Sequence, residues 1–192
     1  MSQELPEMPP EVKGLSYKTA EEVPQEIKDL MYREWLPRIV AAILGVVKKM
    51  PPEHRDAVLV KMAEVCSTFA TPFVGVTPDM GFEEYRKHAS SLQPPLGPAF
   101  VEQTGDIVHG DAPHSIGEDG RPICICPLVQ WGMIEPFPEL CICGASIHAS
   151  FIETATGKRC SRVDVIGSPL MTGESSLRYR VYLKPPLFTT TR

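Results

Sequence analysis

Apolar residues in the first half of the chain recur every three or four positions, which is the period of an amphipathic helix. This pattern predicts three helices, over about residues 25–47, 51–71 and 79–92. Pro37 should kink or split the first helix after Leu36, because proline lacks a backbone donor and clashes with the preceding turn. The second helix should bury a stripe of Val58, Met62, Val65, Cys66 and Phe69.

After a linker rich in proline and glycine at residues 93–98, the apolar pattern changes to the alternation of strands. Strands are predicted at residues 99–108, 123–129, 162–166 and 177–183, with one helix at residues 144–155. The last strand should bury Leu177, Tyr179, Val181 and Leu183 and present Arg178, Arg180 and Tyr182 on its other face. The expected fold class is α+β, with N-terminal helices packed on a small, mostly antiparallel sheet and one further C-terminal helix.

The domain organisation follows from the same pattern. Residues 1–22 place prolines among acidic residues without any period and are expected to form an arm. Residues 23–192 are expected to form a single α+β domain, because a chain of 192 residues is only slightly longer than one typical domain. Its helical part covers residues 23–93, and its sheet and cysteine-rich part covers residues 99–192.

Composition and charge exclude several classes of protein. Apolar residues make up 43% and charged residues 22%, which is typical of a folded chain. A net charge of -5, without a Lys/Arg run interleaved with aromatic residues, argues against nucleic acid as a partner.

The longest apolar stretch, residues 39–47, is about half of what a bilayer requires, and no signal peptide pattern opens the chain. No membrane is therefore expected, and a cytoplasmic location, where thiols stay reduced, is predicted.

Two Cys-x-Cys pairs are the clearest chemical feature of the sequence. Cys124 and Cys126 lie in a predicted strand, where residues two apart share a face, so both sulfurs can point to one site. Cys141 and Cys143 lie just ahead of a predicted helix, whose N-terminal dipole favours thiolate. Four thiolates in a tetrahedral array suit zinc, or alternatively an iron-sulfur cluster.

Two other interpretations of these four cysteines remain open. They are compatible with buried cysteines that act as small apolar side chains, and with dithiols that cycle through disulfides. Cys66 on its helix stripe and Cys160 beside a turn favour a structural role for both.

Histidine and carboxylate residues form a second candidate site. His109, Asp111 and His114 offer imidazole and carboxylate groups that suit a catalytic metal or a general base, although a polar loop rich in glycine also collects such residues by composition alone. His148, about one turn along the predicted helix, is ambiguous in the same way: it is a candidate to contact the residues that bind a metal, or a residue without a role in the site.

Three segments carry a resemblance to a known superfamily: CICPLVQWG at residues 124–132, LCICGASIHASFIETATGK at residues 140–158, and VDVIGSPLMTGESSLRYRVYL at residues 163–183. They resemble the superfamily that contains the 4-vinyl-reductase domains and the L-2-amino-thiazoline-4-carboxylic acid hydrolases. The resemblance implies a small-molecule pocket between helices and sheet, and zinc bound by cysteines as in several sensor members. Where those sensors carry cysteines around the last turn, this sequence has Ser168 and Ser176, so a metal would depend on the Cys-x-Cys pairs.

The functional hypotheses are a metal-dependent hydrolase acting on a small organic carboxylate, a ligand sensor without turnover, and an iron-sulfur or redox protein. The small-molecule ligand is expected beside the metal, between the helix after Cys143 and the strand at residues 177–183, where the helix N-terminus favours anions. Its candidate binding residues are Trp131, His148, Phe151, Arg178 and Arg180. Either arginine binds a carboxylate there only if it points inward, and strand alternation offers the alternative that both face solvent on the outer side of the sheet. A homodimer is compatible with this picture.

Overall fold

The computed structural model describes residues 23–78, 80–93, 97–114, 126–130 and 132–184. Backbone contacts divide the chain into residues 1–39 and residues 40–192. Two of the predicted functional residues, Cys124 and Trp131, lie outside the described residues.

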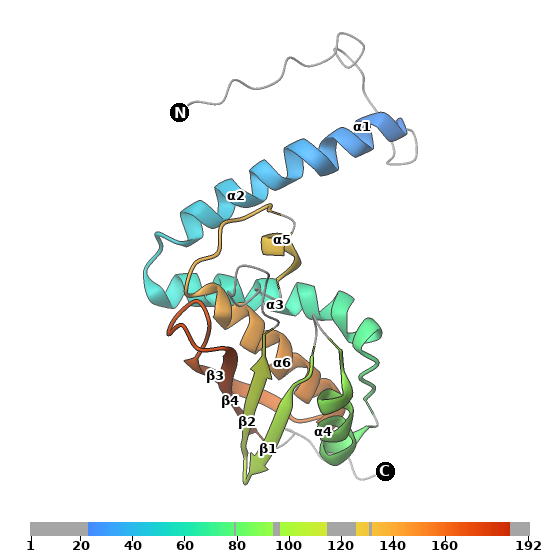
Figure 1. The fold of residues 1–192 in the computed structure, drawn as a ribbon, viewed down its shortest axis with the longest axis vertical. Coiled ribbons are helices and arrows are strands. Elements are labelled where there is room, and N and C mark those ends of the chain that lie inside the picture. Colours follow the sequence, from blue (N-terminus) through green and yellow to red (C-terminus); the bar gives the residue numbers. More distant parts are fainter. Residues whose placement is uncertain (1–22, 79, 94–96, 115–125, 131, 185–192) are drawn as a thin grey trace. The chain divides into compact units, whose positions relative to one another are not determined.

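The first helical segment contains a wide turn where the sequence predicted a break. Helix α1 (Gln25–Leu30) is followed by the π-helical turn η2 (Met31–Trp35) and by α2 (Leu36–Val47) (Figure 1). Pro37, the second residue of α2, has no backbone N–H to donate and lies directly after this wide turn. The backbone N–H of Leu36, just before it, bonds to the carbonyl of Met31, which is the π-helical spacing.

Four antiparallel strands form a sheet with the order β1-β2-β4-β3 (Figure 1). The strands are β1 (Phe100–Thr104), β2 (Ile107–Pro113), β3 (Arg159–Gly167) and β4 (Ser176–Lys184). Together with the helices they confirm the predicted α+β class. The predicted inner face of β4 is also confirmed, because Leu177, Tyr179, Val181 and Leu183 are all buried.

The single strand predicted at residues 99–108 is in fact a β-hairpin. Thr104 pairs with Ile107, so only Gly105 and Asp106 connect β1 to β2. Gly105 has a φ of 61°, a conformation that glycine adopts without steric cost at the first position of a two-residue hairpin turn. The Gly-Asp pair between two alternating segments was therefore the turn signal.

Helices cover the face of the sheet that carries the buried residues of β4, which we call the inner face. Helix α6 (Leu140–Thr156) packs against β3 and β4, α3 (Pro52–Val74) packs against α6, and α4 (Gly81–Ser91) packs against β1 and α6. The short helix α5 (Pro127–Gln130) precedes α6, so the strand predicted at residues 123–129 is wrong from Pro127 onward. We call the opposite face of the sheet, which carries Arg178 and Arg180, the outer face.

The buried stripe of α3 matches the prediction only in part, with Val58, Met62 and Cys66 partly buried. Val65 and Phe69 are 61% and 70% exposed, whereas Leu59, Ala63 and Ser67 are buried. Small residues face the neighbouring helix because they allow close approach of the two backbones, and a search for large apolar residues overlooks them. By length and composition alone α3 is also able to cross a bilayer, a test that core helices of soluble proteins pass as well.

Candidate functional site

The two cysteines at the start of α6 point in different directions. The helix begins at Leu140 rather than near residue 144, so Cys141 and Cys143 both lie in its first turn. Residues two apart in an α-helix are separated by about 200° around its axis. Cys141 accordingly belongs to the core cluster that includes the sheet, and Cys143 to a second cluster with α2 and α3. The two sulfurs of this pair therefore lie in different surroundings.

Cys141 behaves as a small core side chain. It is buried, and burial raises the pKa of its thiol despite a hydrogen bond with the side chain of Ser168 and one with the backbone of Leu170. A protonated thiol in such surroundings is a poor metal ligand and a poor nucleophile.

Cys143 instead meets Cys66 of α3. The hydrogen bond from the side chain of Cys143 lowers the pKa of the Cys66 thiol from 9.0 to about 7, and this effect outweighs the opposing effect of burial. Cys143 is buried, whereas Cys66 is only partly buried. A pKa near 7 means that part of the Cys66 population is thiolate at neutral pH, and Cys66 is the sulfur of the pair with partial access to solvent.

Cys66 was not among the candidate site residues predicted from the sequence, which favoured a structural role for it. Its position next to Ser67, on the side of α3 that carries the small buried residues, is the signal that could have found it. The stripe of large apolar residues placed Cys66 beside Val65 and Phe69, which face solvent.

A third sulfur, that of Cys126, lies near this pair. The carbonyl of Cys126 accepts hydrogen bonds from the N–H groups of Val129 at 3.0 Å and Gln130 at 3.1 Å, which starts α5. Burial raises the pKa of the Cys126 thiol, and the charge of Cys66 raises it further, while the backbone of Val129 and Leu128 opposes both effects. Cys126 is thus close enough to Cys66 for the charge of the Cys66 thiolate to change the pKa of the Cys126 thiol.

The fit of these residues to zinc or to an iron-sulfur cluster is incomplete. Within the ranges that the structure describes, no group of three or more His, Cys, Asp or Glu side chains is placed to hold a metal ion. Cys66 and Cys143 offer two sulfur ligands for a metal, and Cys126 offers a third sulfur nearby. The four-cysteine site stays a prediction, because Cys124 lies outside the described residues.

His148 packs in the core rather than beside the cysteines. Its ring stacks on Tyr179 with the centroids 5.1 Å apart and meets the edge of Phe151 at 6.0 Å. Tyr179 lies directly opposite Gly110 in the register between β2 and β4. Burial and, to a lesser extent, the nearby His114 lower the pKa of His148 to about 4. His148 is thus held by packing contacts with Phe151 and Tyr179, and the ligand-binding roles of His148 and Phe151 stay a prediction.

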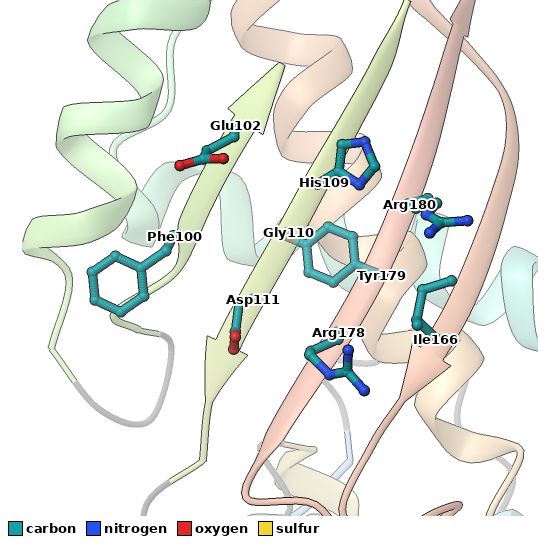
Figure 2. A pocket seen from close by; sticks show the side chains of 9 residues that line it. All are labelled: Phe100, Glu102, His109, Gly110, Asp111, Ile166, Arg178, Tyr179 and Arg180. Carbon is teal, nitrogen blue, oxygen red and sulfur yellow. The ribbon is translucent and has the colours of Figure 1, made fainter. Parts of the chain in front are cut away.

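The structure separates the three residues predicted for catalysis. His114 is buried near His148, and its Nδ1 lies 3.2 Å from the carbonyl oxygen of Ala112. His109 and Asp111 alternate with the buried positions of β2 and lie on the outer face. They line a pocket of about 320 Å³ together with Phe100, Glu102, Gly110, Ile166, Arg178, Tyr179 and Arg180 (Figure 2). Two predicted sets, His109 with Asp111 and Arg178 with Arg180, thus meet on the outer face and not at the start of α6.

Comparison with known proteins identifies no family model that matches the chain, no similar curated protein and no similar solved structure.

Proposed function

We propose that this protein functions through the Cys66–Cys143 pair as a dithiol that is reversibly oxidised to a disulfide. The observation that supports the proposal is the hydrogen bond between the two side chains, which lowers the pKa of Cys66 to about 7. A thiolate available at neutral pH, with a second thiol in contact, is the arrangement of residues that undergo thiol-disulfide exchange. The partial exposure of Cys66 lets a small oxidant reach it.

The exchange occurs in two steps, with a low-molecular-weight disulfide as the oxidant. The Cys66 thiolate attacks one sulfur of the oxidant, a mixed disulfide forms, and one small thiolate leaves. The sulfur of Cys143 then loses its proton and attacks Cys66, which forms the protein disulfide and releases the second small thiolate. The pair loses two electrons, and the oxidant becomes two thiols.

A second candidate function is binding of a soft metal ion, zinc in the first place. It is favoured by a third sulfur, that of Cys126, which lies close enough to interact electrostatically with Cys66. Cys124, two residues before Cys126 in the sequence, is the candidate for a fourth ligand. A site with four thiolates would have a structural role, because a closed tetrahedral shell leaves no position for substrate.

The hydrolase activity implied by the resemblance stays a separate prediction. General acid-base catalysis requires its groups to converge on one substrate. His109 and Asp111 line the pocket of the outer face, whereas His114 lies among buried residues near His148. We therefore attach no reaction to that pocket and consider it a binding site.

Oxidised glutathione tests the proposal on metal-free protein purified without oxygen. We expect a cross-link between Cys66 and Cys143, detected by peptide mass spectrometry as a loss of two hydrogens. Cys143→Ser should instead trap a mixed disulfide between glutathione and Cys66, because the second thiol is missing. Cys66→Ser should abolish both products.

Cys160→Ser is the matched control, because burial raises the pKa of the Cys160 thiol and its Sγ donates to the carbonyl of Arg162 at 3.2 Å. This variant should form the cross-link as the wild type does. Absence of the Cys66–Cys143 cross-link from the metal-free wild type would contradict the dithiol. Stoichiometric zinc in the purified protein, with thiols that react only after chelation, would support the second candidate instead.

A further inference from the structure

The outer face of the sheet carries two cross-strand rows of polar side chains. Phe100, Asp111 and Arg178 lie opposite one another on β1, β2 and β4 and form the first row. Glu102, His109, Arg180 and Asp164 form the second row, which continues onto β3. The pocket of Figure 2 lies over these two rows, with the side chains of β1 on one side and Ile166 of β3 on the other.

Two arginines in or near the pocket are neutralised by carboxylates of their own. Arg178 forms two hydrogen bonds with the carboxylate of Glu174, at 2.6 and 2.7 Å. Arg162 binds Asp164 in the same way, at 2.6 and 2.9 Å. Among the described residues that line the pocket, Arg180 and Glu102 have no ion pair. The charge of Asp111 interacts with that of Arg178, but the Oδ1 atom of Asp111 is buried without a hydrogen-bond partner.

From these observations we infer that the pocket binds a small zwitterion of the α-amino acid class, with its carboxylate on Arg180 and its ammonium group on Asp111. A buried carboxylate oxygen without a donor is costly, and a ligand ammonium group supplies that donor. Arg180 supplies the complementary guanidinium, which is suited to a carboxylate. The inference concerns a site separate from the cysteine pair and does not depend on it.

The register sets a spacing that fits this ligand. Asp111 pairs with Arg178, so Arg180 is its diagonal neighbour, and diagonal positions lie about 7–8 Å apart. An α-amino acid places its charged groups two covalent bonds apart, each about 1.5 Å. With one charge-assisted hydrogen bond of about 2.8 Å at each end, the ligand spans the two side chains.

The pocket also offers apolar surface for a ligand side chain. Phe100 is 53% exposed and lies opposite Asp111, and Ile166 is 39% exposed. A volume of about 320 Å³ is at the lower end of the range for ligand pockets, which suits a molecule of amino acid size.

Three related compounds test the inference by NMR titration of the labelled full-length protein: L-phenylalanine, 3-phenylpropanoate and 2-phenylethylamine. L-phenylalanine should shift the amide signals of β2 and β4. Each compound that lacks one charge should bind at least about tenfold more weakly, because one charged hydrogen-bonded contact is lost. Arg180→Gln and Asp111→Asn should each weaken the binding of L-phenylalanine by a similar factor.

Arg86→Gln is the matched control, because Arg86 is an ion-paired surface arginine on α4 outside this pocket. It should bind L-phenylalanine as the wild type does. The inference fails if the three compounds bind equally, if the shifts map away from β2 and β4, or if Arg180→Gln binds L-phenylalanine unchanged. It also fails if L-phenylalanine causes no shifts at millimolar concentration.

Discussion

Gly110→Ala is expected to destabilise the protein by about 3 kcal/mol, the upper part of the usual range for overpacked cores. An added Cβ would overlap the Cζ and Cε2 atoms of Tyr179 and lie 2.5 Å from its Oη atom. Tyr179 is fully buried and has His148 stacked on its ring, so it has little freedom to move away. Urea denaturation followed by circular dichroism measures the loss as a lower midpoint with an unchanged slope.

Gly45→Ala is the matched control for this prediction. Gly45 lies inside α2, and an added Cβ there meets nothing within 4 Å. Alanine should stabilise the helix slightly, by up to about 1 kcal/mol, because glycine is the poorer helix former. Equal midpoints for the two variants would show that Tyr179 does not pack against Gly110 as described.

Acidification should destabilise the protein by about 3 kcal/mol through His148. The residue is fully buried with a pKa of about 4, whereas histidine in an unfolded chain titrates near 6.5. Between these two values the unfolded chain binds the proton and the folded chain does not, so unfolding becomes more favourable as the pH falls. The free energy of unfolding should decrease by about 1.4 kcal/mol for each pH unit in this window.

His148→Phe isolates this contribution, because phenylalanine keeps a ring against Tyr179 and Phe151 but does not titrate. Its free energy of unfolding, measured by urea denaturation, should depend less on pH between 6.5 and 4 than that of the wild type. His54→Gln, at an exposed position on α3, should retain the wild-type dependence. Identical pH profiles for His148→Phe and the wild type would contradict a buried, neutral His148.

The sheet face of β4 could be predicted from the sequence, because alternation determines which side chains are buried once a strand is recognised. The arrangement of Cys141 and Cys143 could not, because it depends on where α6 begins. An extended chain turns by about 180° per residue and an α-helix by about 100°, so the same Cys-x-Cys spacing brings sulfurs together or separates them. Pro138 and Glu139, directly before Leu140, were the available signal for an early start.

The pairing of Cys66 with Cys143 also could not be predicted from the sequence, but the reason is not helix geometry. It depends on the packing of α3 against α6, two helices far apart in the chain. Val65 and Phe69 extended the predicted stripe onto the exposed side of α3. The small residues that face α6 contribute little to an apolar pattern. The outer-face pocket likewise depends on strand order, which brings β2 beside β4.

The pH dependence of Cys66 alkylation tests the thiol-thiolate pair most directly. We expect the rate of iodoacetamide labelling at Cys66, followed by peptide mass spectrometry, to rise with a midpoint near pH 7. Cys143→Ala should move this midpoint upward toward the ordinary value of 9.0, because the hydrogen-bond donor is lost, and Cys141→Ala should leave it unchanged. A wild-type midpoint near pH 9, or a midpoint that Cys143→Ala does not move, would contradict the account.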